Sequence, residues 1–285
     1  MKSLTSPDEI NQFYRIRSET NWVKRYQSPY LLRRYFFRTM WKVIADQLQQ
    51  ASLVLDVGCG DGVLSVLMAL WHPGQRIIAM DISEEAVRKA KEAAIAHGVA
   101  GRLEFVVADA EHLPFKDGTI PALASSHVLE HLPNFNQGVK EIHRVLRTDG
   151  VAVIAIPACL NPSAIVLLGG DTYWRVSKRS LFAFWIGLIK VVWAWITGRE
   201  GVNEGYAGHQ ELPHVRRFPW RAIQRISSNG LKIEKWMADS LLIPYLGYLI
   251  PQFIRLQEWI DQHLRAKRFW RYFGVGIVMT VRRKQ

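Results

Sequence analysis

The sequence predicts an α/β protein, built on a doubly wound, mostly parallel seven-stranded sheet with two apolar insertions, one after the fifth strand and one after the sixth. Short apolar runs of strand length alternate with helical stretches over much of the chain, as in a parallel sheet covered by helices. The first run leads into a glycine-rich turn at residues 54–62, V-L-D-V-G-C-G-D-G, and a helix pattern follows at once. With 285 residues, 49% of them hydrophobic, the chain is long enough for one large domain with additions.

Seven segments fit the strands, and the rest of the chain divides around them. The predicted strands are 53–57, 75–80, 103–108, 120–126, 151–156, 231–236 and 274–282. The predicted regions are an N-terminal helical cap (1–50), a core with the glycine turn (51–157), an apolar and basic insertion (158–218), and a C-terminal part of the sheet (219–285) with a second insertion at about 240–272.

The glycine turn places three glycines at alternate positions, Gly58, Gly60 and Gly62. Glycine allows positive φ and leaves no Cβ between the backbone and a ligand. The spacing departs from the dinucleotide fingerprint G-x-G-x-x-G, because the third glycine comes one residue early and Val63 stands in its place. Asp56, in the strand before the turn, would repel a pyrophosphate and attract a cationic ligand.

Two more acids follow the next two strands. Asp81 ends the second strand, and Asp109 follows the third in the segment D-A-E-H-L-P-F. The carboxyl ends of parallel strands meet at one edge of the sheet, where ligands of open α/β sheets bind. A carboxylate there can accept hydrogen bonds from both hydroxyls of a ribose, although Asp81 could instead only cap the next helix.

These motifs together resemble the class I S-adenosyl-L-methionine (SAM) methyltransferases. The resemblance rests on D-x-G-x-G-x-G, D-A-x-x-L-P-F, L-E-H-L after the fourth strand, and L-R-T-D-G-x-x-x-I before the fifth; it covers residues 53–157 closely. It implies a Rossmann-like methyltransferase fold, SAM as co-substrate and no metal. The cofactor-binding residues that it implies are Asp56, Gly58, Gly60, Gly62, Asp81, Ile82, Asp109, Ala110 and Ser126.

One part of the family pattern is missing. The fourth strand begins with T-I-P-A at 119–122, where the family has Phe-Asp-x-Val. The lost carboxylate belongs to the strand start, away from the cofactor edge, so we expect SAM binding to survive.

Histidines are the candidate catalytic bases, since their charge changes near neutral pH. His127, just after the fourth strand, should face the transferable methyl group. His209 and His214 lie in the segment expected on the substrate side, with Tyr206 nearby in the sequence. A lone histidine is more often structural. His131 is expected to orient the following helix, and the pair Glu130–His131 lacks a second ligand pair of suitable spacing, so the sequence predicts no metal site.

The charge of the chain is uneven, and its total is +12. Residues 1–50 carry nine Lys/Arg against four Asp/Glu, residues 51–159 carry nine against thirteen, and residues 160–285 carry nineteen against eight. Positive flanks around an acidic core indicate an anionic partner such as membrane lipid, nucleic acid or a phosphorylated substrate, or serve solubility alone.

The first insertion contains an apolar run at 181–196 with basic residues on both sides. Sixteen residues are too few to span a bilayer comfortably, which takes about 20. Eight of the eleven Trp residues lie between Trp174 and Trp270. Trp at the edges of an apolar run with basic flanks is typical of a helix in a bilayer interface, although a buried helix fits as well.

The leading hypothesis is a methyltransferase that is peripheral at a membrane and methylates a lipid, isoprenoid or lipid-linked acceptor. The expected partners are a hydrophobic or lipid-linked acceptor and an anionic membrane surface, with no protein partner evident. The expected location is cytoplasmic, on the inner face of a membrane. The alternatives are a soluble small-molecule methyltransferase with a hydrophobic lid, an RNA methyltransferase, and a SAM-binding module without catalysis. The apolar run disfavours nucleic acid, and two cysteines suit a reduced compartment.

Overall fold

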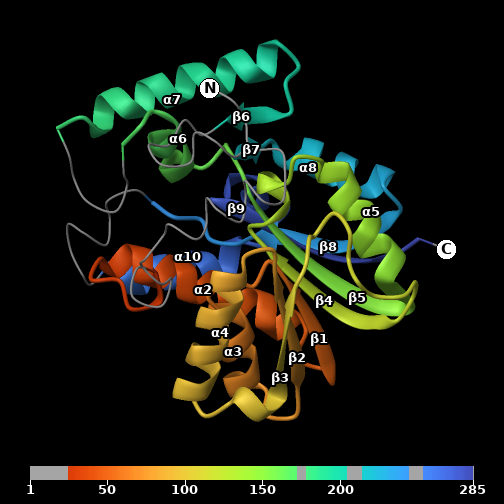
Figure 1. Ribbon diagram of the computed structural model, residues 1–285. Helices are drawn as coiled ribbons and strands as arrows, with labels where there is room; N and C mark the ends of the chain where they lie inside the picture. Colours follow the sequence, from red (N-terminus) through yellow and green to blue (C-terminus); the bar gives the residue numbers. More distant parts are fainter. Residues whose placement is uncertain (1–24, 172–177, 204–213, 244–252, 285) are drawn as a thin grey trace.

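The computed structural model describes residues 25–171, 178–203, 214–243 and 253–284 and contains a central seven-stranded sheet (Figure 1). Its strands are β1 (Leu53–Val57), β2 (Arg76–Asp81), β3 (Leu103–Val107), β4 (Ile120–Ser126), β5 (Leu146–Pro157), β8 (Leu231–Ala238) and β9 (Gly276–Arg283). Their order is β3-β2-β1-β4-β5-β9-β8. All neighbours are parallel except the pairs of β9, which is antiparallel to both β5 and β8. The predicted doubly wound, mostly parallel sheet is confirmed.

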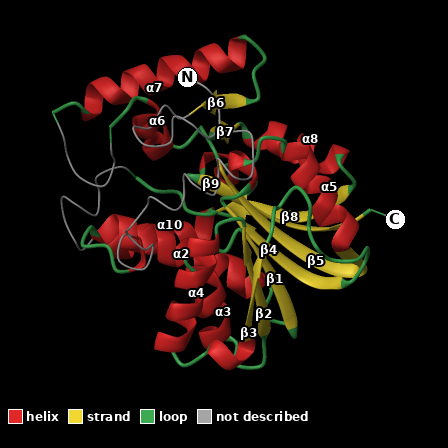
Figure 2. Cartoon of the chain, viewed as in Figure 1, coloured by secondary structure: helices red, strands yellow, loops and turns green. Residues whose placement is uncertain are grey.

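Helices cover both faces of this sheet (Figure 2). The α-helices are α2 (Leu31–Gln47), α3 (Val63–Trp71), α4 (Glu84–Ala96), α5 (Phe135–Val145), α6 (Pro162–Leu168), α7 (Ser180–Ile196), α8 (Pro219–Ser228) and α10 (Phe253–Leu264). Short 3-10 turns are η2 (Ala100–Arg102), η3 (Leu129–His131) and η4 (Trp270–Phe273), and β6 (Gly201–Asn203) pairs with β7 (Val215–Arg217) in a separate small sheet.

Successive residues of a strand pack in two separate apolar layers, one on each face of the sheet. Val54 of β1 packs in one layer with side chains of α2 and α3, whereas Leu55 packs in the other with side chains of α5 and α8. Alternation follows from the strand period of two, and burial on both faces explains the nearly continuous apolar strands. The two layers leave the strand ends as the edge where polar side chains collect.

The start of the fifth strand differs from the prediction. We predicted that the fifth strand spans residues 151–156, but β5 already begins at Leu146, which pairs with Ile120. The next paired residues are Ala122 and Val151, so the extra residues of β5 form an irregularity in the ladder. The polar sequence R-T-D-G is typical of a turn, but β-bulges favour the same residue types.

A buried aspartate fastens the N-terminal helix to the C-terminal part of the chain. Asp261 of α10 accepts hydrogen bonds at 2.7 Å from Tyr35 Oη of α2, from Ser240 Oγ and from the Leu241 amide. Burial raises the pKa of Asp261, and these donors partly offset the shift. The rest of the predicted N-terminal cap, residues 1–24, lies outside the described residues.

Helices α6 and α7 of the first insertion pack through small residues. A Cβ on Gly169 would lie 1.6 Å from the Ala183 carbonyl oxygen, and one on Gly187 would lie 1.9 Å from the Ile165 carbonyl oxygen. The backbones therefore touch, and α7 turns its small residues inward. None of the helices within the described residues is both long and apolar enough to cross a bilayer.

We expect Gly187→Ala to lower the free energy of unfolding by about 1–3 kcal/mol, because the new Cβ must push the two helices apart. Alanine is the better helix former by about 1 kcal/mol, so a net loss isolates the steric effect. Gly74→Ala is the matched control, since nothing lies within 4 Å of its added Cβ. Denaturant unfolding measures both, and unchanged stability of Gly187→Ala would contradict the close packing.

Candidate functional site

The glycine turn between β1 and α3 is shaped by three left-handed residues. Gly58, Gly60 and Gly62 have φ of 71°, 55° and 79°. A Cβ on Gly58 would lie 2.2 Å from a methyl carbon of Val128, and one on Gly62 would lie 2.8 Å from the Ala90 Cβ. The turn therefore needs glycine for its conformation and for its contact with the segment after β4.

Two of the predicted acids meet beneath this turn. The Gly60 amide donates a 2.8 Å hydrogen bond to Oδ2 of Asp81, and the Ser83 amide donates to Oδ1 at 3.0 Å. Ser65 Oγ of α3 donates a 2.5 Å bond to Oδ2 of the buried Asp56. Each carboxylate oxygen has two lone pairs, so Asp81 can still accept hydrogen bonds from a ligand.

The acids at this edge of the sheet favour a cationic ligand over an anionic one. Burial raises the pKa of Asp56 to about 7, an effect that the Ser65 hydroxyl offsets in part and the charge of Asp81 increases. Burial also raises the pKa of Asp81, and the charge of Asp61 adds to it. Asp61 is itself buried within the turn. Charge repulsion of this kind is relieved when a cationic ligand enters.

The predicted adenine-side residues follow β3. Oδ1 of Asp109 accepts a 2.8 Å bond from the Glu111 amide, and Oδ2 lies 3.0 Å from Nδ1 of His112. Ala110 is buried. Ile82, the remaining residue predicted on this side, follows β2 directly, so these residues stand at the same sheet edge as the glycine turn.

The end of β4 forms the next part of this edge. Ser126 is the last residue of β4, and His127 follows with a φ of 57°, the only non-glycine residue with positive φ in the described part of the chain. Such a conformation costs of order 1 kcal/mol and is found most often at functional sites. Nδ1 of His127 lies 3.1 Å from Oε1 of Glu130, which is fully buried, and its Nε2 is buried with no hydrogen-bond partner within the described residues.

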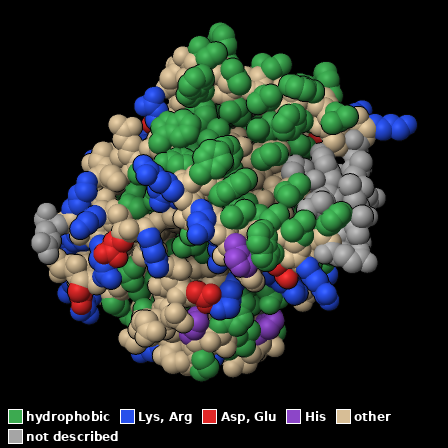
Figure 3. Space-filling model, turned by 180° about the vertical axis from the view of Figure 1, so that it is seen from behind, with side chains coloured by type: hydrophobic (Ala, Val, Ile, Leu, Met, Phe, Trp, Pro, Cys, Tyr) green, Lys and Arg blue, Asp and Glu red, His purple; other side chains and the backbone are tan. Residues whose placement is uncertain are grey.

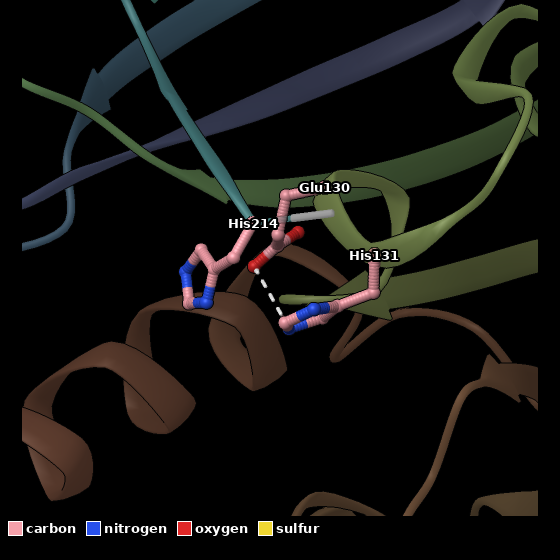
Figure 4. Close-up of side chains that lie close together, drawn as sticks. All are labelled: Glu130, His131 and His214. Atoms are coloured by element: carbon pink, nitrogen blue, oxygen red, sulfur yellow. Dashed lines mark ion pairs between the residues drawn. The ribbon is translucent and has the colours of Figure 1, made fainter. Parts of the chain in front are cut away.

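Residues from distant parts of the chain surround Glu130 (Figure 4). Nε2 of His131 lies 4.0 Å from Oε1 of Glu130, and the His131 ring stands edge-on to the His214 ring at 4.6 Å between centroids. Burial opposes ionisation of Glu130, but the hydrogen bond from His127 and the charges of His127 and His131 outweigh it and lower its pKa.

Two further histidines, His131 and His209, were singled out in the sequence. His131 was expected to orient the next helix, but α5 is capped by Asn134, whose side chain accepts from the Gln137 amide. His209, a candidate base besides His127 and His214, lies outside the described residues.

Three buried charged residues at this edge were missed by the sequence reasoning. Besides Asp61, they are Asp239 and Arg217. Asp239 follows β8, and burial raises its pKa to about 6. The Arg217 guanidinium, at the end of β7, lies 4.1 Å from the centroid of the Phe135 ring, and burial lowers its pKa. Only Asp239 carried a signal in the sequence, because it is a charged residue just after a predicted strand. Charged residues at such positions are common on any protein surface.

The fold and the site define a class of protein. An open parallel sheet with a glycine turn, a buried acid near the end of β1, a half-buried acid at the end of β2 and an acid after β3 provides a site for a cationic nucleoside ligand. The ribose, the adenine and a positive sulfonium of SAM match these groups.

Comparisons with known proteins agree with this class. Residues 55–154 match the model of a methyltransferase domain. The ubiquinone/menaquinone biosynthesis C-methyltransferase UbiE of Geotalea uraniireducens is 34% identical over 102 residues, 35% of this chain and 43% of that protein. The mitochondrial arginine-hydroxylase NDUFAF5 of Mus musculus is 30% identical over 178 residues, 60% of this chain and 46% of that protein.

A solved structure has the same fold over most of its length. The geranyl diphosphate C-methyltransferase of Streptomyces coelicolor A3(2), in complex with Mg2+, geranyl diphosphate and S-adenosyl-L-homocysteine, superimposes with a TM-score of 0.57. It shares 14% sequence identity, and the match covers 97% of each chain. Residues 55–154 of this chain are thus a methyltransferase domain similar to that of the class I SAM-dependent methyltransferases. The chain spans about half of the length of several curated relatives.

We expect Asp56→Asn to be more stable than the wild type at pH 8 and similar at pH 4. The pKa of Asp56 rises from 3.8 to about 7 on folding, so the wild type loses stability as pH rises through this range. The difference should reach up to about 4 kcal/mol above pH 7. Denaturant unfolding at several pH values measures it.

The same variant should bind SAM at least about tenfold more weakly at pH 8, because the site loses one negative charge. Asp117→Asn is the control, since the Asp117 side chain is 74% exposed. Equal stability of Asp56→Asn and wild type at pH 8 would show that Asp56 carries no buried charge.

Proposed function

We propose that this chain is a SAM-dependent methyltransferase that docks on an anionic membrane surface through α7 and methylates a lipid, isoprenoid or lipid-linked acceptor. The observation that carries the membrane part is the large apolar face that α7 leaves exposed. The cofactor site and the match to a methyltransferase domain support the methyltransferase part.

The two sides of α7 differ in the size of their residues. Small residues, Ala183, Gly187 and Ala194, lie on the side packed against the protein. The opposite side exposes large apolar side chains, with Leu181 at 78% and Ile189 at 67% exposure. The exposed set is Leu181, Phe182, Trp185, Ile189, Val192, Trp193, Trp195 and Ile196. A soluble helix buries its large side chains, so this reversed pattern favours an apolar environment outside the protein.

The surroundings of this face favour an anionic bilayer. Lys178 and Arg179 precede α7, and Arg199 follows it. Figure 3 shows a broad apolar area in the upper part of the molecule, with Lys and Arg side chains below it. Basic residues near a lipid surface each add about 1 kcal/mol of attraction to anionic headgroups, and interfacial Trp residues anchor such helices.

The acceptor class follows from the same surface and is supported by the relatives. One is named as acting in quinone biosynthesis and another as methylating geranyl diphosphate, both isoprenoid chemistry. A third carries the name of an arginine-hydroxylase, so catalysis in this chain needs its own test.

The methyl-transfer step requires alignment and, for a protonated nucleophile, a base. The acceptor atom attacks the sulfonium methyl in line, the carbon–sulfur bond breaks with its electron pair, and S-adenosyl-L-homocysteine leaves. His127 follows β4 with Nδ1 held near Glu130, which leaves the buried Nε2 as the nitrogen that would take the acceptor proton. His209 remains a second candidate for this role.

We expect the wild-type chain to sediment with vesicles that contain an anionic lipid and not with neutral vesicles. Trp185→Glu/Ile189→Glu should weaken this binding at least about tenfold, because both exposed side chains lose their burial in the interface. Ile95→Glu is the matched control: Ile95 is 61% exposed on α4, at the opposite end of the molecule from α7 (Figure 1).

Each result of the sedimentation experiment has a defined reading. Wild-type chain that binds neither kind of vesicle would contradict the membrane hypothesis and leave α7 as a lid over a small acceptor. Binding lost equally in Ile95→Glu would show a general charge effect. Retained SAM affinity confirms that each variant is folded.

We expect methyl-labelled SAM to transfer its label into the organic phase of a membrane lipid extract when the wild-type chain is added. His127→Gln should lower this rate at least about 100-fold, the usual effect of losing a general base, while SAM affinity changes little. His97→Gln, an exposed histidine after α4, is the control. Label that stays in SAM with every lipid fraction, despite tight SAM binding, would contradict the lipid acceptor.

A further inference from the structure

We propose that Glu130, His131 and His214 bind a divalent transition-metal ion at the acceptor side of the sheet edge. These residues come from η3, directly after β4, and from the residue before β7. This ligand set could not be predicted from the sequence, because His214 lies far along the chain from Glu130 and His131.

The three side chains converge on one point. One ligand atom from each residue, a carboxylate oxygen of Glu130 and a ring nitrogen of each histidine, lies within 4.8 Å of the other two. Figure 4 shows the carboxylate between the two imidazole rings. Ligand atoms about 2 Å from an ion are separated by about 3 to 4 Å, so small rotations of the rings complete the set.

The buried carboxylate is the reason to expect a cation here. The side chain of Glu130 is fully buried, and Nδ1 of His127 lies 3.1 Å from its Oε1. The second oxygen, Oε2, has no hydrogen-bond partner within the described residues, and a bound metal ion would use its lone pairs.

The identity of the ligands selects the kind of ion. Two imidazoles and one carboxylate suit Zn2+, Fe2+, Co2+ or Ni2+, whereas Mg2+ and Ca2+ prefer oxygen ligands. Arg217 interacts electrostatically with Glu130, and the positive charge of this guanidinium would repel a bound metal ion. Glu200, whose Oε2 lies 3.6 Å from Nε of Arg217, offsets part of this charge and also pairs with Arg225.

Three protein ligands leave coordination positions open for a substrate. An acceptor hydroxyl or phosphate oxygen bound there would be held next to His127, and the ion would lower the pKa of a hydroxyl before methyl transfer. This role rests on the proposed function, whereas binding of the ion does not.

The test measures metal content on a chain without a histidine tag. The protein is treated with EDTA, given a slight excess of Zn2+, freed of unbound ion and measured by elemental analysis. We expect one equivalent per chain for the wild type. We expect a dissociation constant at least about 100-fold higher for His131→Gln/His214→Gln, because two of three ligands are lost. His97→Gln should match the wild type.

A second measurement does not depend on folding of the variants. X-ray absorption of the Zn2+-loaded wild type should show two imidazole nitrogens at about 2.0–2.1 Å and at least one oxygen. A wild type that retains no stoichiometric Zn2+, or a zinc environment without imidazoles, would overturn the proposal. Equal loss of zinc in His97→Gln would do the same, because it would indicate scattered surface binding.

Metal binding and methyl transfer can fail separately. A chain that retains zinc through His131 and His214 but transfers no methyl group keeps the metal site and loses the proposed function. A chain that methylates lipid at the same rate after EDTA treatment and in the double variant keeps the function and removes the role of the ion in it.

Discussion

The hydrogen bond from the Gly60 amide to Asp81 is the constraint on which the rest of the site depends. It ties the glycine turn after β1 to the end of β2. The same turn allows Val128 to approach Gly58 so closely that any side chain there would clash. Val128 lies between His127 and η3, so the geometry of the turn also fixes the loop that carries His127 and Glu130. One local conformation therefore positions both halves of the site.

The buried acids at this edge of the sheet lower the stability of the fold. Burial raises the pKa of both Asp56 and Asp239, so each carboxylate destabilises the fold when it ionises near neutral pH. Two apolar layers, one on each face of the sheet, offset this cost. A preorganised set of buried charges is expected at a ligand site, because the protein bears the cost of desolvating them before the ligand arrives.

The strands and the position of the three acids at one edge of the sheet could be predicted because their signals are local. Each of Asp56, Asp81 and Asp109 ends or follows a strand in its own segment, and parallel topology brings strand ends together. The cluster around Glu130 could not be predicted, since it requires His214 to reach η3 from another element. The sequence also does not show which face of α7 packs against the protein, because apolar residues cover both faces. The close contacts of Gly169 and Gly187 identify the buried face.

The first insertion links the two surfaces that the proposals use. β6 follows α7 directly and pairs with β7, and β7 reaches the sheet through the contact of Arg217 with Ala158 at the end of β5. β7, which is preceded by His214 and ends at Arg217, therefore belongs to the same unit as α7 and its exposed apolar face. A lipid surface that holds α7 would fix this unit in place, and the acceptor-side residues would be ordered where a lipid-borne acceptor arrives. Docking and acceptor binding are then coupled through one short strand pair, without motion of the sheet.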